Sequence, residues 1–350
     1  MKYAALLACF VFATMGPNAP ASAQTASSPT LSDLARDTAP DRVARLLPAA
    51  RKEGALLLYT TVPPANLDRL IADFEKRYGV KVQVWRSGSD KVVARALGEA
   101  RANRHDADAL IFGAPEQEAL HAEGLLQEVR SAAHARLVEG VLPAHRAYAP
   151  VYLNLFAQAY NTDKIRKEDL PRTFFDLLDP KWKGRLGIES KDQEWFLAVV
   201  QDMGEARGTK FFQDLVERNG ISVRTGHSVL TNMVASGEVP FALTVHSYMP
   251  EQLKRKGAPI DWFVLEPAVV RANAIGIMRR APHPNAALLF YEYMLTDAQP
   301  ILAEMAYIPS VRVEDSPLKN LRVRVLDAKE VLNDNDRWTK LFEATLRGTR

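Results

Sequence analysis

Short apolar runs and stepped apolar positions alternate along the first third of the chain. Residues 55–59 form an apolar run, as expected of a strand buried on both faces of a parallel sheet. The next apolar positions step by three and four, like one face of a helix, and the following ones alternate like a strand. They are Leu67, Leu70, Ile71, Phe74 and Tyr78, and then Val80, Val82 and Val84. A strand, helix and strand in this order predict a right-handed crossover unit.

The same alternation continues to about residue 300. It predicts a helix over 92–100, a strand over 108–112 and a helix from Pro115. Residues 151–160 form a long apolar strand that we expect to cross into a second lobe. That lobe would contain helices over 194–203 and 227–236 and a strand over 239–245, and residues 274–278 would form the return strand.

The fold class predicted from this pattern is α/β, with two interleaved lobes joined by hinge strands. We expect lobe 1 to comprise residues 51–155 and 275–350, and lobe 2 to comprise residues 156–274. A helix over 287–295 would pack back on lobe 1. We expect each lobe to have its own sheet, not one continuous sheet through both.

The N-terminus has the pattern of an exported protein. Lys2 precedes an apolar run over 4–15, and Ala21-Ser22-Ala23 is a cleavage signal, so residues 1–23 are predicted to be a signal peptide. The run is too short to span a bilayer as a helix, although an uncleaved anchor is the alternative. Residues 24–50 would hold a leader and the first helix. We therefore expect a periplasmic location.

Composition excludes several classes of protein. The only cysteine among the 350 residues is Cys9, inside the predicted signal, so disulfides, thiolate metal sites and cysteine catalysis are not expected in the mature chain. The net charge is +3, and acidic residues are interspersed among most basic clusters. We therefore expect no nucleic-acid partner.

Three segments, in the same order, carry a resemblance to a known family. Residues 170–188 contain D-L-L-D-P-K-W-K-G, residues 159–162 read A-Y-N-T, and residues 281–287 read A-P-H-P-N-A-A. They resemble the solute-binding proteins of bacterial ABC importers of the iron(III)-binding type, over roughly residues 54–309. The resemblance implies a type 2 periplasmic-binding-protein fold. It also implies hinge closure on a small solute, and delivery of that solute to a permease in the inner membrane.

An enzyme is the competing class, most plausibly a secreted hydrolase. The sequence has no G-x-S-x-G, H-E-x-x-H or P-loop motif. Asp176 and Asp179 could be mistaken for a catalytic pair, but their place beside Pro180 indicates turn and capping roles. We therefore expect a monomeric receptor that is not an enzyme and needs no cofactor.

The first lobe offers four candidate ligand-binding residues. Ligands of open α/β sheets bind beyond the carboxyl ends of the strands, which selects Thr60, Thr61, Ser87 and Ser89. Ser89 stands at a predicted helix start, where hydroxyl and free N–H groups favour an anion. The alternatives are a helix cap for the serines and a solvated loop for the threonines.

The second lobe offers six more. His227 and Ser228 lie in a turn that resembles the family's G-x-S turn, and the loop with Asp192 resembles one that contacts the solute or its anion. Trp195 could stack on an organic ligand or be core, and His246 with Tyr248 could grip an organic anion or be core.

The resemblance also bears on metal binding. Family members that hold Fe(III) use a pair of adjacent tyrosines after the strand that matches 239–245, but here only Tyr248 remains, and Met249 stands where the second is needed. A thioether is a soft ligand and does not replace tyrosinate. We therefore predict no metal ligands and no tight Fe(III) site, and an anionic organic solute. Iron(III) completed by an exogenous anion is the alternative.

Overall fold

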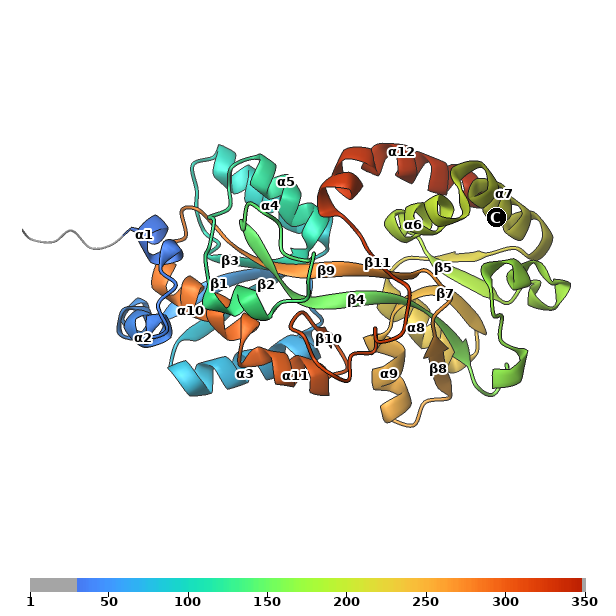
Figure 1. Ribbon diagram of the computed structural model, residues 1–350, viewed down its shortest axis with the longest axis horizontal. Coiled ribbons are helices and arrows are strands. Elements are labelled where there is room, and N and C mark those ends of the chain that lie inside the picture. The colour runs from blue at the N-terminus through green and yellow to red at the C-terminus, as the bar shows by residue number, and fades with distance from the viewer. Residues whose placement is uncertain (1–29, 348–350) are drawn as a thin grey trace, which may run out of the picture.

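The computed structural model describes residues 30–347 and has two lobes side by side (Figure 1). The predicted signal peptide, residues 1–23, lies outside the described residues. Two long strands run between the lobes, and the elements of each lobe gather around one end of these strands. This arrangement is the interleaved α/β fold that the sequence predicts.

Lobe 1 is built from crossover units close to those predicted. Helix α3 begins with Pro64 at its first position and ends at Gly79, whose φ of 71° is left-handed, so the chain can turn into the next strand. Strand β1 pairs in parallel with β2 and β3. The elements are α1 (Leu31–Arg36), α2 (Arg42–Glu53), β1 (Ala55–Thr60), α3 (Pro64–Tyr78), β2 (Lys81–Arg86), α4 (Ser89–Arg101), β3 (Ala109–Gly113), α5 (Ala114–Ala122), α10 (Pro284–Leu295), α11 (Ala298–Glu304) and β10 (Ile308–Pro309).

Lobe 2 repeats the parallel arrangement with β5 between β6 and β7. The turns before β5 confirm the capping roles expected of Asp176 and Asp179, which accept backbone N–H bonds from Thr173 at 2.9 Å and from Lys181 at 2.9 Å. The elements are β5 (Leu186–Glu189), α6 (Gln193–Met203), α7 (Glu205–Asn219), β6 (Ser222–Arg224), α8 (His227–Ser236), β7 (Phe241–His246), α9 (Tyr248–Arg255) and β8 (Ile260–Phe263). Two more elements come near the end of the chain: β11 (Val323–Val325) and α12 (Ala328–Leu346).

The two hinge strands are β4 (Tyr148–Asn161) and β9 (Ala268–Ile277), which pair antiparallel. On the lobe 1 side β9 also pairs with β3, and on the lobe 2 side β4 pairs with β7 and β8. The hydrogen bonds therefore continue from one lobe to the other, in the order β2-β1-β3-β9-β4-β7-β5-β6. The expectation of two unconnected sheets is wrong, because the 14-residue strand β4 is long enough to belong to both.

The hydrophobic cores of the lobes are nevertheless separate. Leu155 belongs to the core of lobe 1 and Phe156 to that of lobe 2, so β4 crosses between these residues. At the start of β9 the residues alternate, since Ala268 and Val270 belong to the core of lobe 1 and Val269 to that of lobe 2.

The last helix departs from the expected division of the chain. Trp338 and Phe342 of α12 pack in the core of lobe 2, where Phe342 lies 5.3 Å from Phe196 between ring centroids. The helix also contacts α5 of lobe 1. Residues 275–350 therefore do not all pack with lobe 1, because α12 lies across both lobes (Figure 1). The other predicted bounds stay predictions.

No helix within residues 30–347 combines the length and the apolar character that a bilayer span requires.

Candidate ligand site between the lobes

The ends of several strands meet where the lobes face each other. Strands β1 and β3 end at Thr60 and Gly113 on the lobe 1 side, and β5 and β7 end at Glu189 and His246 on the lobe 2 side. The hinge strands pass between them. This is the position that the rule for open α/β sheets predicts for a ligand.

The first-lobe candidates differ in what their hydroxyl groups do. Thr60 is fully buried, and its hydroxyl donates to the carbonyl of Ile111 at 2.8 Å and accepts the N–H of Val62 at 3.1 Å. That hydroxyl therefore holds the turn after β1. The side chains of Thr61, Ser87 and Ser89 make no hydrogen bond with the described residues, and Gly88, not a serine, is the N-cap of α4. The capping alternative for the two serines does not hold.

In lobe 2, a buried acid–base pair lies between the loop after β5 and the start of α8. Asp192 Oδ1 lies 3.3 Å from His227 Nε2, and the Asp192 side chain is 3% exposed. Burial lowers the pKa of His227, but the charges of Asp192 and Glu189 outweigh it and the pKa is raised. Asp192 Oδ2 and His227 Nδ1 are buried and have no partner among residues 30–347. Ser228, in contrast, is exposed.

His246 stands beside this pair. Its ring centroid is 4.0 Å from that of His227, and its Nδ1 also lacks a partner within the described chain. Burial and the nearby charges of His227 and Arg271 lower the pKa of His246 well below its ordinary value. His246 is therefore a neutral imidazole that can donate a lone pair.

Tyr248 is buried among other tyrosines. Its ring stacks on Tyr307 at 4.1 Å between centroids, and Tyr307 packs on Tyr152 of β4 at 4.5 Å. Burial raises the pKa of Tyr248 well above its ordinary value, so its phenol stays protonated. Sequence reasoning did not find Tyr152 and Tyr307, because they come from distant segments.

The prediction that Trp195 stacks on a ligand is wrong. Its side chain is 1% exposed and packs edge-on against Phe174 and Phe212, both at 5.8 Å, inside the core of lobe 2. Successive residues of a helix point in different directions, and here the neighbouring Glu194 reaches the site. Its carboxylate pairs with Arg271 Nη1 at 2.5 Å.

Arg271 of β9 is the centre of a charged group that the sequence analysis missed. Glu194 of lobe 2 and Glu116 of lobe 1 lie 2.5 and 3.9 Å from its guanidinium. Burial lowers the pKa of Arg271, but these two carboxylates raise it above its ordinary value. The signal in the sequence was a single arginine within the otherwise uncharged strand Ala268–Ile277.

Two asparagines share the face of Arg271. Asn154 lies opposite Arg271 in the β4–β9 register, and Asn273 lies two residues further along β9. Both are 4% exposed. We call Asn154, Arg271 and Asn273 the hinge floor.

Within residues 30–347, two groups of side chains have ligand atoms close enough to share a metal ion. Glu189, Asp192 and His227 each offer one atom within 4.8 Å of the others, at the inter-lobe site. Glu118, His121 and His145 do the same in lobe 1. There, however, His145 Nδ1 already accepts the N–H of Ala147 at 3.1 Å and Nε2 lies 3.0 Å from Glu118, which leaves His145 no free lone pair.

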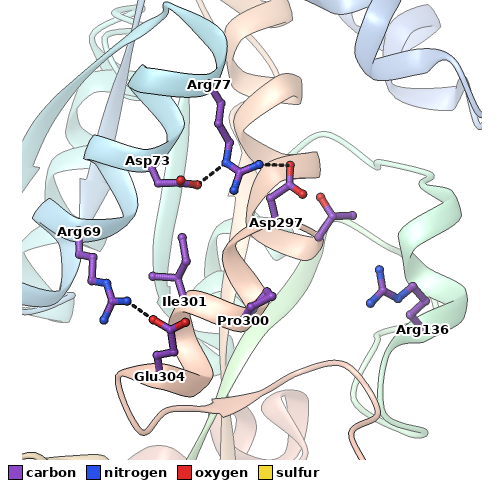
Figure 2. Close-up of a pocket in the computed structure, with 9 residues that line it drawn as sticks. Arg69, Asp73, Arg77, Arg136, Asp297, Pro300, Ile301 and Glu304 are labelled. Carbon is purple, nitrogen blue, oxygen red and sulfur yellow. Dashed lines mark hydrogen bonds and ion pairs between the residues drawn. The ribbon is translucent and has the colours of Figure 1, made fainter.

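A separate pocket of about 580 Å³ lies between α3 and α11 on lobe 1 (Figure 2). Its charged side chains largely satisfy one another: Arg77 lies 2.6 Å from Asp73, and Arg69 pairs with Glu304. None of the inter-lobe residues lines it. The pocket therefore gives no indication of the ligand.

Comparisons with known proteins agree with this architecture. The chain is 24% identical to iron uptake protein A1 of Synechocystis sp. over 261 residues, which cover 69% of this chain and 71% of that protein. Iron-bound HitA from Pseudomonas aeruginosa has a TM-score of 0.72 and 21% identity, covering 83% of this chain and 99% of that one.

Two further structures were solved with other ligands. Trichodesmium IdiA (FutA) in complex with iron and citrate has a TM-score of 0.67 at 22% identity, covering 83% of this chain and 99% of that one. The periplasmic binding protein AfuA from Actinobacillus pleuropneumoniae, with fructose-6-phosphate bound, has a TM-score of 0.69 at 20% identity, covering 84% and 99%. These likenesses establish the two-lobed fold of periplasmic binding proteins.

The family model described as bacterial extracellular solute-binding protein matches residues 58–307, well over half of the sequence. The chain belongs to this family of solute-binding proteins.

Proposed function

We propose that the chain is the periplasmic substrate-binding component of an ABC importer and that its cargo is a metal cation bound together with a small anion. One observation carries the proposal. Ligand atoms of Glu189, Asp192 and His227 lie within 4.8 Å of one another between the lobes, and Asp192 Oδ2 has no partner within residues 30–347.

The chemistry of these donors suits a transition metal. Carboxylate and imidazole bind iron, zinc and manganese, whereas the tyrosine pair that grips bare Fe(III) is missing. His246, a neutral imidazole beside His227, is a further donor. Because the protein supplies only a few ligands, some coordination positions of the metal stay open, and a small anion can fill them. This favours the alternative of iron(III) completed by an exogenous anion.

The charges around the site also favour a cation in the cargo. Four carboxylates, of Glu116, Glu189, Asp192 and Glu194, lie around Arg271 and His227. A bare anion would meet more negative than positive groups. A metal with its anion offers positive charge to the carboxylates and negative charge to Arg271.

Uptake would follow from closure of the lobes. Asp192 and His227 belong to lobe 2, Glu116 to lobe 1 and Arg271 to the hinge, so only the closed form makes every contact with the cargo. The loaded receptor would then deliver its cargo to an inner-membrane permease. We expect a secreted monomer that binds no nucleic acid and catalyses no reaction, a role that the solute-binding relatives support.

Titration calorimetry of the chelator-treated mature protein tests this proposal. Ferric citrate, zinc alone and citrate alone are titrated into wild type and into Asp192→Asn, which keeps the shape of the side chain but removes a charged ligand. We expect Asp192→Asn to weaken binding of ferric citrate and of zinc by roughly ten- to a hundredfold.

Asp163→Asn is the matched control, because Asp163 is exposed and its substitution changes the net charge equally. Equal affinity of Asp192→Asn and wild type for both metal probes would overturn the proposal.

A metal-free organic anion is the second candidate. It is favoured by Arg271 Nε, which is buried without a partner in the described chain, and by the first turns of α4 and α8, which contain Ser89 and Ser228. Native mass spectrometry of protein purified from its own periplasm separates the two, because a metal–anion complex and an organic anion differ in mass and isotope pattern.

A further inference from the structure

Helix α11 of lobe 1 is capped at its C-terminal end by two side chains of lobe 2. The last carbonyl groups of a helix have no partner inside the helix and need one elsewhere. Gln252 of α9 donates from Nε2 to the carbonyl of Met305 at 2.7 Å. Arg255 of the same helix donates from Nη1 to the carbonyl of Glu304 at 2.9 Å. A helix of one lobe is thus completed by the other lobe.

The backbone after α11 presents these carbonyls to α9. Ala306 has a left-handed φ of 66°, and its N–H group and that of Tyr307 bond back to carbonyls of α11 at 2.9 and 3.0 Å. A left-handed residue is the usual way to end a helix. The last two carbonyl groups therefore face α9 and not a further turn of α11.

The side chain of Arg255 is held in place by its own lobe. Its Nε donates to a carboxylate oxygen of Glu251 at 2.9 Å, and the other oxygen of Glu251 accepts the Nε1–H of Trp262 at 3.0 Å. One part of the guanidinium is therefore fixed within lobe 2, while its Nη1 group reaches the end of α11.

Tyrosine rings join the same elements close to the hinge. Tyr248, the first residue of α9, stacks on Tyr307 at 4.1 Å between centroids and belongs to the core of lobe 1. Tyr307 packs on Tyr152 at 4.5 Å, and the next residue, Ile308, pairs with Leu153 of the hinge strand β4. The start of α9 therefore lies at the hinge, where a rotation of the lobes displaces atoms least.

Gln252 and Arg255 lie further along α9, on the side of the hinge strands where α11 lies (Figure 1). A helix rises about 1.5 Å per residue, which places Arg255 about 10 Å from the start of α9. A rigid-body rotation of about 15° moves a group at that distance from the axis by about 2–3 Å, enough to break a hydrogen bond. The two bonds to α11 therefore depend on the angle between the lobes.

We propose that the contact of α9 with the end of α11 is a latch for the closed receptor. Gln252 and Arg255 bind the carbonyls of α11 when the lobes are together and release them when the lobes open. This inference rests on the lobe closure of the proposed function, but not on the identity of the cargo. Because the cargo makes all its contacts only in the closed form, the latch tightens the binding of every cargo by the same factor.

Methionine substitutions test the latch. Gln252→Met and Arg255→Met keep long, unbranched side chains but remove the hydrogen-bond donors, so the packing of α9 changes little. Pulsed electron paramagnetic resonance measures the distances between two spin labels in the chelator-treated mature protein. The labels are attached to Lys91→Cys of α4 and Asn232→Cys of α8, which are exposed positions on opposite lobes.

We expect each single variant to lower the ratio of closed to open molecules by about threefold and the double variant by about tenfold, since one net hydrogen bond is worth about that factor. Calorimetric titration of ferric citrate and of zinc alone complements the distances. If the cargo-free wild type is mostly open, both affinities should fall by the same factor. If it is mostly closed, the distances should lengthen in the variants.

Two matched controls make the same substitutions without touching lobe 1. Lys254→Met removes a cation of α9 that pairs with Asp261 at 2.7 Å within lobe 2. Gln213→Met removes an exposed amide of α7. Both are expected to leave the distances and the two affinities unchanged.

The outcomes separate the latch from the metal proposal. Unchanged distances and unchanged affinities in the double variant would overturn the latch, as would equal changes in the controls. Weaker binding of ferric citrate with unchanged zinc affinity would also overturn it, because the side chains would then act on the cargo and not on closure. A wild type that binds neither probe would overturn the metal proposal alone, and the distances in the cargo-free protein would still decide on the latch.

Discussion

At the scale of single residues, Gly113 determines where Arg271 can lie. A Cβ atom added at Gly113 would be 2.4 Å from Arg271 Nη2 and 2.3 Å from Glu116 Oε2, far inside normal contact. Both atoms are at the ends of side chains that their ion pairs hold in place. Glycine is therefore needed here for space, so that the guanidinium can lie over the end of β3.

We predict that Gly113→Ala weakens cargo binding by about tenfold or more, because it displaces a hydrogen-bonding group, and lowers stability by only about 1–3 kcal/mol. Calorimetric titration and urea denaturation measure the two effects. Gly98→Ala is the control: nothing lies within 4 Å of that Cβ, and alanine in a helix is favoured by up to about 1 kcal/mol. Equal affinities of the two variants would contradict this role of Gly113.

A second residue-scale effect concerns pH. His134 Nε2 lies 2.8 Å from the hydroxyl of Tyr291, and burial, with the charges of Arg146 and Arg42, lowers the pKa of His134 from 6.5 to about 4. Between these two values the unfolded chain binds a proton that the folded chain does not. The free energy of unfolding therefore falls as the pH is lowered from 6.5 towards 4.

We predict that His134→Gln loses this pH dependence. At pH 7 the variant should be less stable than wild type by about 1 kcal/mol, the usual value of one hydrogen bond. At pH 4.5 the difference should shrink or reverse, because only wild type has a histidine to protonate. Urea denaturation at both values measures it, and a difference of the same size at both would show that His134 does not titrate in this way.

At the scale of elements, the apolar periodicity predicted β1, α3, α8 and their neighbours to within a few residues. Each has a strong local signal, such as the apolar stripe of α3 between Pro64 and Gly79. The site could be predicted only in part. Asp192, His227 and His246 were singled out by the resemblance of their segments to the family, and they lie at or after the ends of strands in the structure.

The hinge floor was missed for a physical reason. Asn154 and Arg271 lie in the middle of long, mainly apolar strands, and a strand interior carries no local sign of a ligand. They form a surface only through the pairing of β4 with β9, which are more than a hundred residues apart. Trp195 was misplaced because a one-residue shift on a helix turns a side chain by about 100°.

The packing of α6 on α7 allows an element-scale prediction. A Cβ atom at Gly208 of α7 would lie 2.7 Å from both Cα and the carbonyl oxygen of Val200 on α6, and backbone atoms cannot yield as side-chain ends do. Gly208→Ala should therefore destabilise the protein by about 1–3 kcal/mol in urea denaturation, despite the better helix propensity of alanine. A variant as stable as Gly98→Ala would show that the two helices can move apart freely.

At the scale of the whole molecule, the lobes are joined beside the hinge strands by α12, which contacts α5, and by α9, which bonds to α11 and the residue after it. A further contact is an ion pair. Lys191 of lobe 2 pairs with Asp90 of lobe 1 near the inter-lobe site, and both side chains are largely exposed. An exposed ion pair contributes little to folding, but this one exists only when the lobes are close together. Its energy therefore acts on the balance between the open and closed forms.

We predict that Lys191→Ala increases the dissociation rate of the cargo by up to about fivefold at low salt, the factor that corresponds to 1 kcal/mol. Stopped-flow measurements with ferric citrate report this rate. The effect should disappear near 1 M salt, where screening acts over about 3 Å.

Lys210→Ala is the matched control, because it removes a lysine paired with Asp214 at 2.7 Å within α7 alone. An equal rate change in both variants would mean that the pair between the lobes does not favour closure. A rate change in Lys191→Ala alone would mean that an ion pair which does not contact the cargo prolongs the time for which the cargo stays bound.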